Sequence, residues 1–174
     1  MIVSLQKTIT NVQFLFFFTL FSGVGMTCFA QNDKGDLEKI KKEIMACDSI
    51  LFQRGYNHCD TASVSKILAS DFEFYHDQAG AIYSPSNFLN ALTGLCQMDY
   101  KASRELDLST TEIHILKNNG EIYAVLQSGH HSFFAENTST PKHKTSSAKF
   151  HHLWFKSNAS WKLKRVISFD HQLP

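Results

Sequence analysis

Two hydrophobic periods divide the chain into a helical part and a part made of strands. Between residues 36 and 58, apolar side chains recur at spacings of three and four, which places them on one face of an α-helix. The members of that face are Leu37, Ile40, Ile44, Cys47 and Leu51. Asp60 can cap a second, short helix over residues 61–70, and Ser84 followed by Pro85 predicts a third helix that ends near Cys96.

Elsewhere the period changes to two, which is the period of a β-strand. Residues 72–76 alternate between apolar and polar, residues 77–80 supply a turn, and residues 81–83 return as a short strand. The later part of the chain predicts strands over residues 100–108, 111–117, 121–136, 148–156 and 161–170, with an exposed loop over 137–147. We therefore expect an α+β fold in which the helices pack on one face of a curved antiparallel sheet.

The first thirty residues follow neither period and are typical of an export signal. Lys7 precedes an apolar stretch that is short for a transmembrane span, and the small residues Cys28 and Ala30 fit a cleavage site after Ala30. We expect a signal peptide over residues 1–30 and one exported domain, periplasmic or extracellular, over residues 31–174. A lipoprotein that begins at Cys28 is the alternative, although Gly25 and Thr27 fit its cleavage box poorly.

Removing this segment changes the charge of the chain. The full sequence carries 17 Lys+Arg and 16 Asp+Glu, and Lys7 is the one charged residue of the segment, so the mature chain has no net charge. A neutral chain is not typical of a protein that binds nucleic acid or a membrane surface, and we expect neither partner. All nine His remain, and they are the largest reserve of charge that can change near neutral pH.

Three Cys follow the segment, and an exported protein folds where a disulfide can form. Cys59 and Cys96 each lie at the end of a predicted helix, and we expect them to form a disulfide. Cys47 lies on the apolar face of its helix and is expected to be a small core residue. Three buried thiols remain the alternative, because connectivity cannot be deduced from spacing alone.

The order of the predicted elements resembles the nuclear transport factor 2-like superfamily, which includes the SnoaL-like proteins. The segments 74–77, 104–105, 129–133, 149–154 and 168–171 resemble an exported bacterial branch of it, known as a domain of unknown function, and the resemblance covers residues 36–171. It implies a cone-shaped fold with a pocket between the sheet and the long helix, and a homodimer formed through the outer sheet face. It does not imply one activity, because isomerases, dehydratases, cyclases, scaffolds and binding modules share this fold.

Five predicted strands each carry one basic side chain in phase with large apolar residues. These side chains are His76, Arg104, His131, His152 and His171. Inward residues of a curved sheet converge on its concave side, so we expect them to form the polar part of an otherwise apolar pocket. The full expected lining is Phe74, His76, Arg104, His131, Phe133, Phe150, His152, Trp154 and His171. The alternative is that each imidazole is a core residue bonded to a neighbouring element.

Four of these residues, His76, Arg104, His131 and His152, are candidate catalytic residues. His131 or His152 would act as general base, and Arg104 would hold an anion or oxyanion. His76 with Asp77, and Asp170 with His171, are candidate pairs because they lie at strand ends, although neighbours within a strand face opposite sides. No Asp lies on a clear inward phase, which argues against an isomerase-like mechanism.

Metal and cofactor sites have little support in the sequence. No His lies at a recognised metal-binding spacing, His151 and His152 cannot both point inward, and GxGxxG, GxxxxGK[ST], GxSxG, HExxH and CxxC are absent. We therefore expect no metal and no cofactor, and a domain that binds a small anionic or carbonyl-bearing molecule. The alternatives are a lyase, isomerase or hydrolase with a pocket His as general base, and a non-catalytic dimeric interaction module.

Overall fold

The computed structural model describes the backbone of residues 27–174 and the side chains of residues 35–174. Three helical regions appear in the predicted order. Helix α1 (Thr27–Ser49) continues directly into a π-helix, η1 (Ile50–Tyr56), and then come α2 (Thr61–Ile67) and α3 (Pro85–Leu95). Both predicted caps are present, because the side chains of Asp60 and Ser84 accept the backbone N–H groups of Ser63 and Asn87. The change to wider turns after Ser49 is not visible in the hydrophobic pattern.

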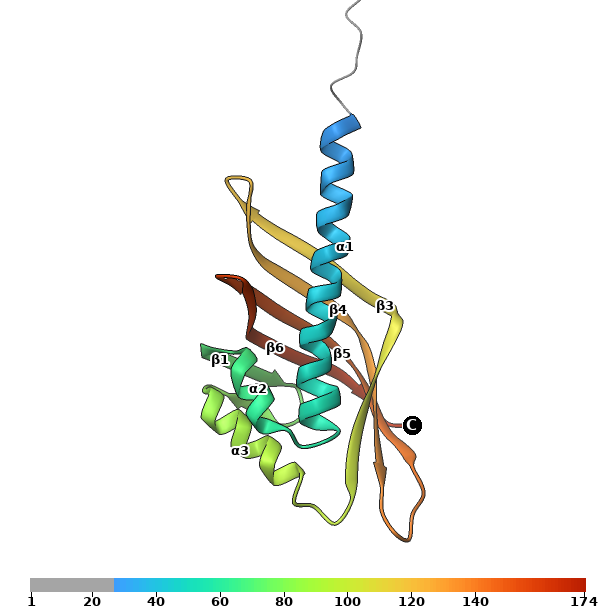
Figure 1. The fold of residues 1–174 in the computed structure, drawn as a ribbon. Coiled ribbons are helices and arrows are strands. Elements are labelled where there is room, and N and C mark those ends of the chain that lie inside the picture. The colour runs from blue at the N-terminus through green and yellow to red at the C-terminus, as the bar shows by residue number, and fades with distance from the viewer. Residues whose placement is uncertain (1–26) are drawn as a thin grey trace, which may run out of the picture.

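Six strands form one curved sheet, and the helices pack on one of its faces (Figure 1). The strands are β1 (Leu68–His76), β2 (Gly80–Ile82), β3 (Lys101–Asn118), β4 (Glu121–Glu136), β5 (His143–Ser157) and β6 (Ser160–Gln172), in the order β2-β1-β6-β5-β4-β3. This confirms the expected α+β class. One pair departs from the antiparallel pattern, because the last strand, β6, lies beside β1 and runs parallel to it.

The two strands predicted over residues 100–108 and 111–117 are one long strand, β3. The register with β4 shifts between Asp107 and Glu112, and local hydrogen bonds fill the gap. The hydroxyls of Thr110 and Thr111 donate to the Asp107 carbonyl, and Ser109 donates to the Asp107 carboxylate. These polar residues are typical of a turn, but here they form a bulge that bends the strand without ending it.

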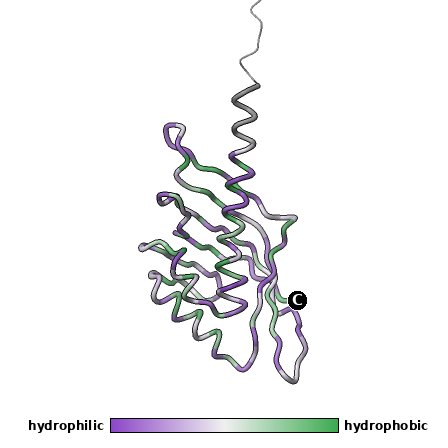
Figure 2. The backbone as a smooth tube through the Cα atoms, in the orientation of Figure 1, coloured by the Kyte–Doolittle hydropathy of each residue, from purple (hydrophilic) through white to green (hydrophobic). Residues whose placement is uncertain are grey.

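The hydrophobic core lies between the helices and the sheet. It combines Ile40, Ile44 and Leu51 from α1 and η1, Val64 and Ile67 from α2, Leu92 from α3, and Phe72, Val125, Trp154 and Leu163 from the sheet. Figure 2 shows hydrophobic and hydrophilic segments alternating along the backbone, with hydrophilic residues prominent in the hairpin loops. Full burial of each large apolar side chain stabilises the fold by about 1.5–3 kcal/mol.

A disulfide between Cys59 and Cys96 joins the segment after η1 to the end of α3. The two Cα atoms are 5.9 Å apart, and 37 positions separate the residues in sequence. Closing a loop of this size stabilises a fold by about 3–4 kcal/mol, mainly by restricting the unfolded chain. Cys47 is a free, half-buried thiol.

The predicted signal peptide lies outside the residues whose side chains the structure describes, and the cleavage site after Ala30 remains a prediction. Within the described part of the chain, no helix combines the length and the apolar character needed to cross a membrane.

Candidate functional site

A cavity of about 410 Å³ is lined by η1, α3 and the inner face of the sheet. Most of its wall is apolar, with Leu51, Phe52 and Tyr56 from η1, Phe88, Ala91, Leu92 and Leu95 from α3, and Phe74, Ile82, Phe133 and Val166 from the sheet. Its polar residues are His76, Gln78, His131, Thr145, Ser146, His152, Ser168 and His171. Six of the nine predicted lining residues are therefore at the cavity, whereas Arg104, Phe150 and Trp154 lie behind it.

A buried ion pair joins α1 to β3 behind the cavity. Arg104 Nη1 donates to Asp48 Oδ2 at 2.9 Å, and Arg104 Nη2 lies 3.4 Å from Asp48 Oδ1. Burial raises the pKa of the Asp48 carboxyl against the opposing effect of the guanidinium, and burial also lowers the pKa of Arg104. The guanidinium carbon lies 3.9 Å from the centre of the Phe52 ring. Arg104 is thus committed to contacts within the protein.

Gln127 extends this network to His152. Its Nε2 donates to Asp48 Oδ1 at 3.1 Å, and its Oε1 accepts the indole N–H of Trp154 at 2.9 Å. His152 Nδ1 lies 3.3 Å from the same Oε1. An amide oxygen only accepts hydrogen bonds, so Nδ1 of His152 carries the proton and its Nε2 has a free lone pair. Burial, and then the charge of Arg104, lower the pKa of His152 well below its usual value, so the ring is neutral.

His131 has the opposite tautomer. Arg104 Nε donates to His131 Nδ1 at 3.2 Å, and an arginine cannot accept a hydrogen bond in return. The proton of the neutral ring is therefore on Nε2. Burial, followed by the charge of Arg104, lowers the pKa of His131 to about 3, so the ring is neutral near pH 7.

These two rings offer a donor and an acceptor that no group of the described residues uses. Among the side chains that the structure describes, His131 Nε2 and His152 Nε2 are the buried polar atoms without a hydrogen-bond partner. Both residues line the cavity and are almost fully buried, with 3% and 0% of their surfaces exposed. Leaving such a group unpaired costs about 1–3 kcal/mol. A ligand that accepts from His131 and donates to His152 would recover that free energy. We call this buried network the deep cluster, which consists of Asp48, Arg104, Gln127, His131 and His152.

A second polar group, called the rim cluster, consists of His76, Asp77, Ser168 and His171. His171 Nδ1 lies 2.5 Å from Asp77 Oδ1, and the backbone N–H of His171 donates to Asp77 Oδ2 at 3.2 Å. His171 Nε2 lies 3.4 Å from Ser168 Oγ, and the rings of His76 and His171 stack with their centres 4.2 Å apart.

The sequence predicts two His–Asp pairs between neighbouring residues, but neither of them is the shortest His–Asp contact in the rim cluster. That contact runs across strands, from Asp77 to His171. His76 Nδ1 is 3.5 Å from Asp77 Oδ1, and Asp170 points away from its neighbour and pairs with Lys149 at 2.9 Å.

Simple alternation along the strand does not explain why the His171 side chain lines the cavity. A register shift near Lys164 reverses the phase of β6, so that Val166 and Ser168 are buried while Ile167 is 41% exposed. Simple alternation along this strand would place Ile167 and Phe169 on the same inward face as Leu163, and the shift makes that expectation wrong. Asp170 then adopts a left-handed backbone conformation, with φ at 57°, which turns His171 back toward the inside.

Two residues of the deep cluster, Asp48 and Gln127, are absent from the predicted site. Both carry a detectable signal, which is a polar side chain on an apolar phase. Asp48 lies four residues after Ile44 and three before Leu51, and Gln127 lies two residues after Val125. The expectation that no Asp is buried is wrong, because the buried carboxylate comes from the helix and not from a strand.

Within the described part of the chain, three side chains of the rim cluster are the group that lies close enough together to bind one metal ion. Ligand atoms of His76, Asp77 and His171 all lie within 4.8 Å of one another. However, His76 Nδ1 already accepts the backbone N–H groups of Gln78 and Ala79 at 3.1 and 3.2 Å, and His171 Nδ1 already contacts Asp77. A metal ion at these atoms would have to displace those hydrogen bonds.

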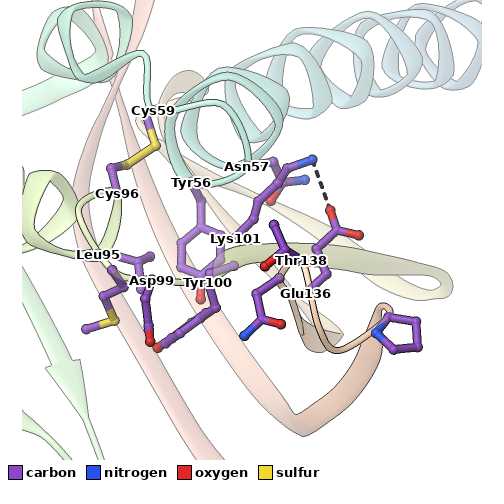
Figure 3. Close-up of a pocket in the computed structure, with 14 residues that line it drawn as sticks. Tyr56, Asn57, Cys59, Leu95, Cys96, Asp99, Tyr100, Lys101, Glu136 and Thr138 are labelled. Carbon is purple, nitrogen blue, oxygen red and sulfur yellow. Dashed lines mark ion pairs between the residues drawn. A yellow bond between two sulfur atoms is a disulfide. The ribbon is translucent and has the colours of Figure 1, made fainter.

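A second, more open hollow of about 580 Å³ lies beside the disulfide (Figure 3). Tyr56 and Leu95 line both cavities. Burial raises the pKa of Tyr56 to about 12, which keeps its phenol protonated. Lys101 and Glu136 form an exposed ion pair at 3.2 Å across this hollow. The unpaired buried nitrogens belong to the first cavity, and we therefore place the candidate site there.

Comparisons with known proteins inform the fold. No protein-family model matches the sequence, and no curated protein matches it. The resemblance to one exported bacterial branch therefore remains a prediction.

Solved structures do match. Aln2 from a Streptomyces species is 7% identical, with a TM-score of 0.63 over 75% of this chain and 89% of that one. ActVI-ORFA from Streptomyces coelicolor is 13% identical, with a TM-score of 0.63 over 77% and 98% of the two chains. A nuclear transport factor 2-like superfamily protein from Salmonella enterica is 18% identical, with a TM-score of 0.60 over 79% and 93%. At these identities the likeness concerns the fold, and the chain has the nuclear transport factor 2-like fold.

Proposed function

We propose that this protein binds a small, uncharged, carbonyl-bearing molecule in the cavity between η1, α3 and the sheet. The observation that carries the proposal is the pair of opposite tautomers at His131 and His152, whose outer nitrogens are buried without partners among the described residues. The ligand's carbonyl oxygen would accept the Nε2–H of His131, and a hydroxyl or N–H group of the ligand would donate to Nε2 of His152.

The charge of the cavity supports a neutral ligand over an anionic one. Among the described side chains, no Lys or Arg lines the cavity, and the nearby guanidinium of Arg104 is paired with Asp48. Both deep imidazoles are neutral near pH 7, because their pKa values are lowered. An anion would therefore enter the cavity without a partner of opposite charge, which is costly in an apolar site. The cavity volume of about 410 Å³ is in the range of small-molecule sites.

Catalysis by the deep cluster is a second candidate function. Its support is that His131 offers a donor for a carbonyl oxygen while His152 offers a lone pair, the combination that general acid–base chemistry needs. A base works best when its pKa is close to the working pH, and burial lowers the pKa of His152 far below that point. For this reason we place binding first.

We also propose that the protein is exported. The disulfide between Cys59 and Cys96 supports this, because such bonds persist mainly in oxidising compartments. Intact-mass analysis of the protein secreted by its host should show a chain that begins at Gln31. A full-length cytoplasmic chain would contradict the proposal.

A thermal-shift screen with uncharged ketones, lactones and amides tests the binding proposal. Binders should lose about 10–100-fold in affinity when His152 is replaced by Phe, since the donor of the ligand is then buried without a partner, which costs about 1–3 kcal/mol. His151→Phe is the matched control, because His151 is the neighbour of His152 and bonds to Ser128 at 3.0 Å outside the cavity. Equal loss in both variants, or a library without any binder, would overturn the proposal.

The tautomers can be measured without a ligand. Nitrogen-15 spectra at pH 7 should place the ring proton of His131 on Nε2 and that of His152 on Nδ1. The same tautomer in both rings would remove the donor and acceptor pair on which the proposal rests.

A further inference from the structure

We propose that the rim cluster hydrolyses small, uncharged carboxylic esters, with Ser168 as the nucleophile, His171 as its base, Asp77 as the residue that orients His171, and His76 as the donor to the oxyanion. This activity goes beyond the binding function, because it uses neither His131 nor His152.

The proton positions in the rim cluster follow from its hydrogen bonds. Burial favours the neutral acid of Asp77, but hydrogen bonds from the backbone and ring of His171 outweigh it and lower the pKa of Asp77. The carboxylate therefore accepts the Nδ1 proton of His171 at 2.5 Å. In the neutral form of the His171 ring, this arrangement puts the Nε2 lone pair on the side of Ser168 Oγ, at 3.4 Å. Such a contact is long, as is common in catalytic groups without substrate.

The three residues thus have the connectivity of a nucleophile, a base and an orienting carboxylate. They come from two strands that run side by side. Asp77 follows the end of β1, Ser168 and His171 lie on β6, and the backbone N–H of Asp77 donates to the Ser168 carbonyl at 3.2 Å. The backbone thereby holds the two strand ends together independently of the side chains.

His76 is placed to stabilise the charge that develops on an ester oxygen. It lies directly opposite Ser168 in the register between β1 and β6, and both residues line the cavity. Its Nδ1 accepts two backbone N–H groups, so the proton of the neutral ring is on Nε2. Burial, and then the neighbouring His171, lower the pKa of His76, which favours this neutral donor.

The reaction balances with water as the one co-reactant. Ser168 Oγ forms a bond to the ester carbonyl carbon while its proton moves to His171 Nε2, and the Nε2–H of His76 donates to the oxyanion. The bond from carbon to the alcohol oxygen then breaks, and the alcohol leaves with the proton from His171. Water then gives a proton to His171 and attacks the acyl carbon. The bond from that carbon to Ser168 Oγ breaks, and His171 returns its proton to Oγ, which releases the carboxylic acid and restores the Ser168 hydroxyl.

The walls beside the rim cluster define the substrate class. Phe133 stacks near His171 with ring centres 6.2 Å apart, and Phe74 lies 5.8 Å from His76. These rings favour an apolar acyl group, and the absence of Lys and Arg from the described lining favours an uncharged ester. The volume of about 410 Å³ restricts it to a small molecule.

Covalent labelling of the full exported chain tests the nucleophile. A fluorophosphonate probe should label Ser168, as located by peptide mass spectrometry, and p-nitrophenyl butyrate should be hydrolysed. Ser168→Ala should lose the label and lower the rate at least about 100-fold. Ser132→Ala is the matched control, because Ser132 is a half-buried strand serine that does not line the cavity. Labelling at another residue, or hydrolysis that persists in Ser168→Ala, would overturn the proposal.

Two further measurements keep the proposal falsifiable if Ser168→Ala folds poorly. Ser168→Cys preserves the side-chain size and should react with iodoacetamide faster at higher pH, with the rate reduced when Asp77→Asn is added. Hydrolysis by the wild type should be unchanged by EDTA, and a requirement for zinc would overturn the proposal in favour of a metal site. Because the label is read without a carbonyl ligand, its absence would leave the binding proposal intact.

Discussion

The deep cluster and the rim cluster place the same type of side chain in two different chemical environments of one cavity. In the deep cluster, His131 and His152 are almost fully buried beside the Arg104 cation, and their pKa values fall far enough to keep both rings neutral. In the rim cluster, His171 contacts the Asp77 carboxylate, which has 34% of its side chain exposed. The comparison shows that the burial of an imidazole and the charge of its neighbours, and not its presence at a cavity alone, decide what it can do.

A row of aromatic rings connects the two clusters. The centres of His152 and Phe150 are 4.4 Å apart, those of Phe150 and His131 are 5.0 Å apart, and those of His131 and Phe133 are 4.6 Å apart. Phe133 then stacks toward His171. A ligand that contacts Phe133 is therefore adjacent to both clusters, and its polar groups determine which one it engages.

Removing a carboxylate from each cluster should give the largest difference. Asp48→Ala leaves the Arg104 cation buried without its partner and should lower the free energy of unfolding by about 3–5 kcal/mol. Asp77→Ala removes a carboxylate at the surface and should lower it much less. Urea unfolding of the two variants measures both values. Equal losses of unfolding free energy would contradict the prediction that the buried ion pair stabilises the fold more than the exposed carboxylate does.

Acid should destabilise the protein through the deep cluster. The pKa of His131 is about 3 in the folded protein and about 6.5 in the unfolded chain, so between these values the unfolded state binds more protons. The stability that depends on the neutral ring is complete above pH 6.5 and is lost as the pH falls toward 3, with a slope of about 1.4 kcal/mol per pH unit.

His131→Gln tests this slope, because its amide oxygen can still accept the N–H of Arg104. Urea unfolding between pH 6.5 and 5 should show a slope reduced by about 1 kcal/mol per unit, because the unfolded-state imidazole is only half protonated at pH 6.5. The exposed His114 gives the control for the loss of an imidazole, and His114→Gln should change the slope much less than His131→Gln does. A slope that does not change in His131→Gln would mean that this ring does not stay neutral in the folded state.

The smallest expected effect concerns one hydrogen bond of the deep cluster. Trp154→Phe removes one of the two donors to Gln127 Oε1, and this lost bond should cost about 0.5–1.5 kcal/mol of stability in addition to the buried volume that the smaller ring leaves empty, while the contact with His152 remains. Trp161→Phe is the matched variant, since its indole donates at 2.8 Å to Glu43 in a partly buried bond. We expect a smaller loss there, and the reverse order in urea unfolding would contradict the importance of Gln127.

Alternation and helical spacing predict which face of an element a residue lies on, but not which side chains it contacts there. The spacing of Ile40, Ile44 and Leu51 predicts the buried face of the first helix, and alternation places His131 and His152 inside. The partners Asp48 and Gln127 depend on how the helix meets the sheet, which no local period encodes. The inward turn of His171 depends on the backbone of Asp170, and the parallel pairing of β6 with β1 depends on strands about ninety positions apart.

The π-helix η1 gives the chain a sensitivity to length at one point. The backbone N–H of Asn57 donates to the Phe52 carbonyl five residues earlier, so this turn is one residue longer than an α-helical turn. Deleting one residue between Ile50 and Tyr56 would restore the ordinary turn, and each residue of an α-helix advances by about 100° around the axis. Asp48 would then rotate out of line with Arg104, or Tyr56 would rotate away from the cavity. The wide turn thus sets the rotation of Asp48 relative to Tyr56 around the helix axis. Natural or engineered variants of this segment should therefore tolerate substitutions far better than deletions.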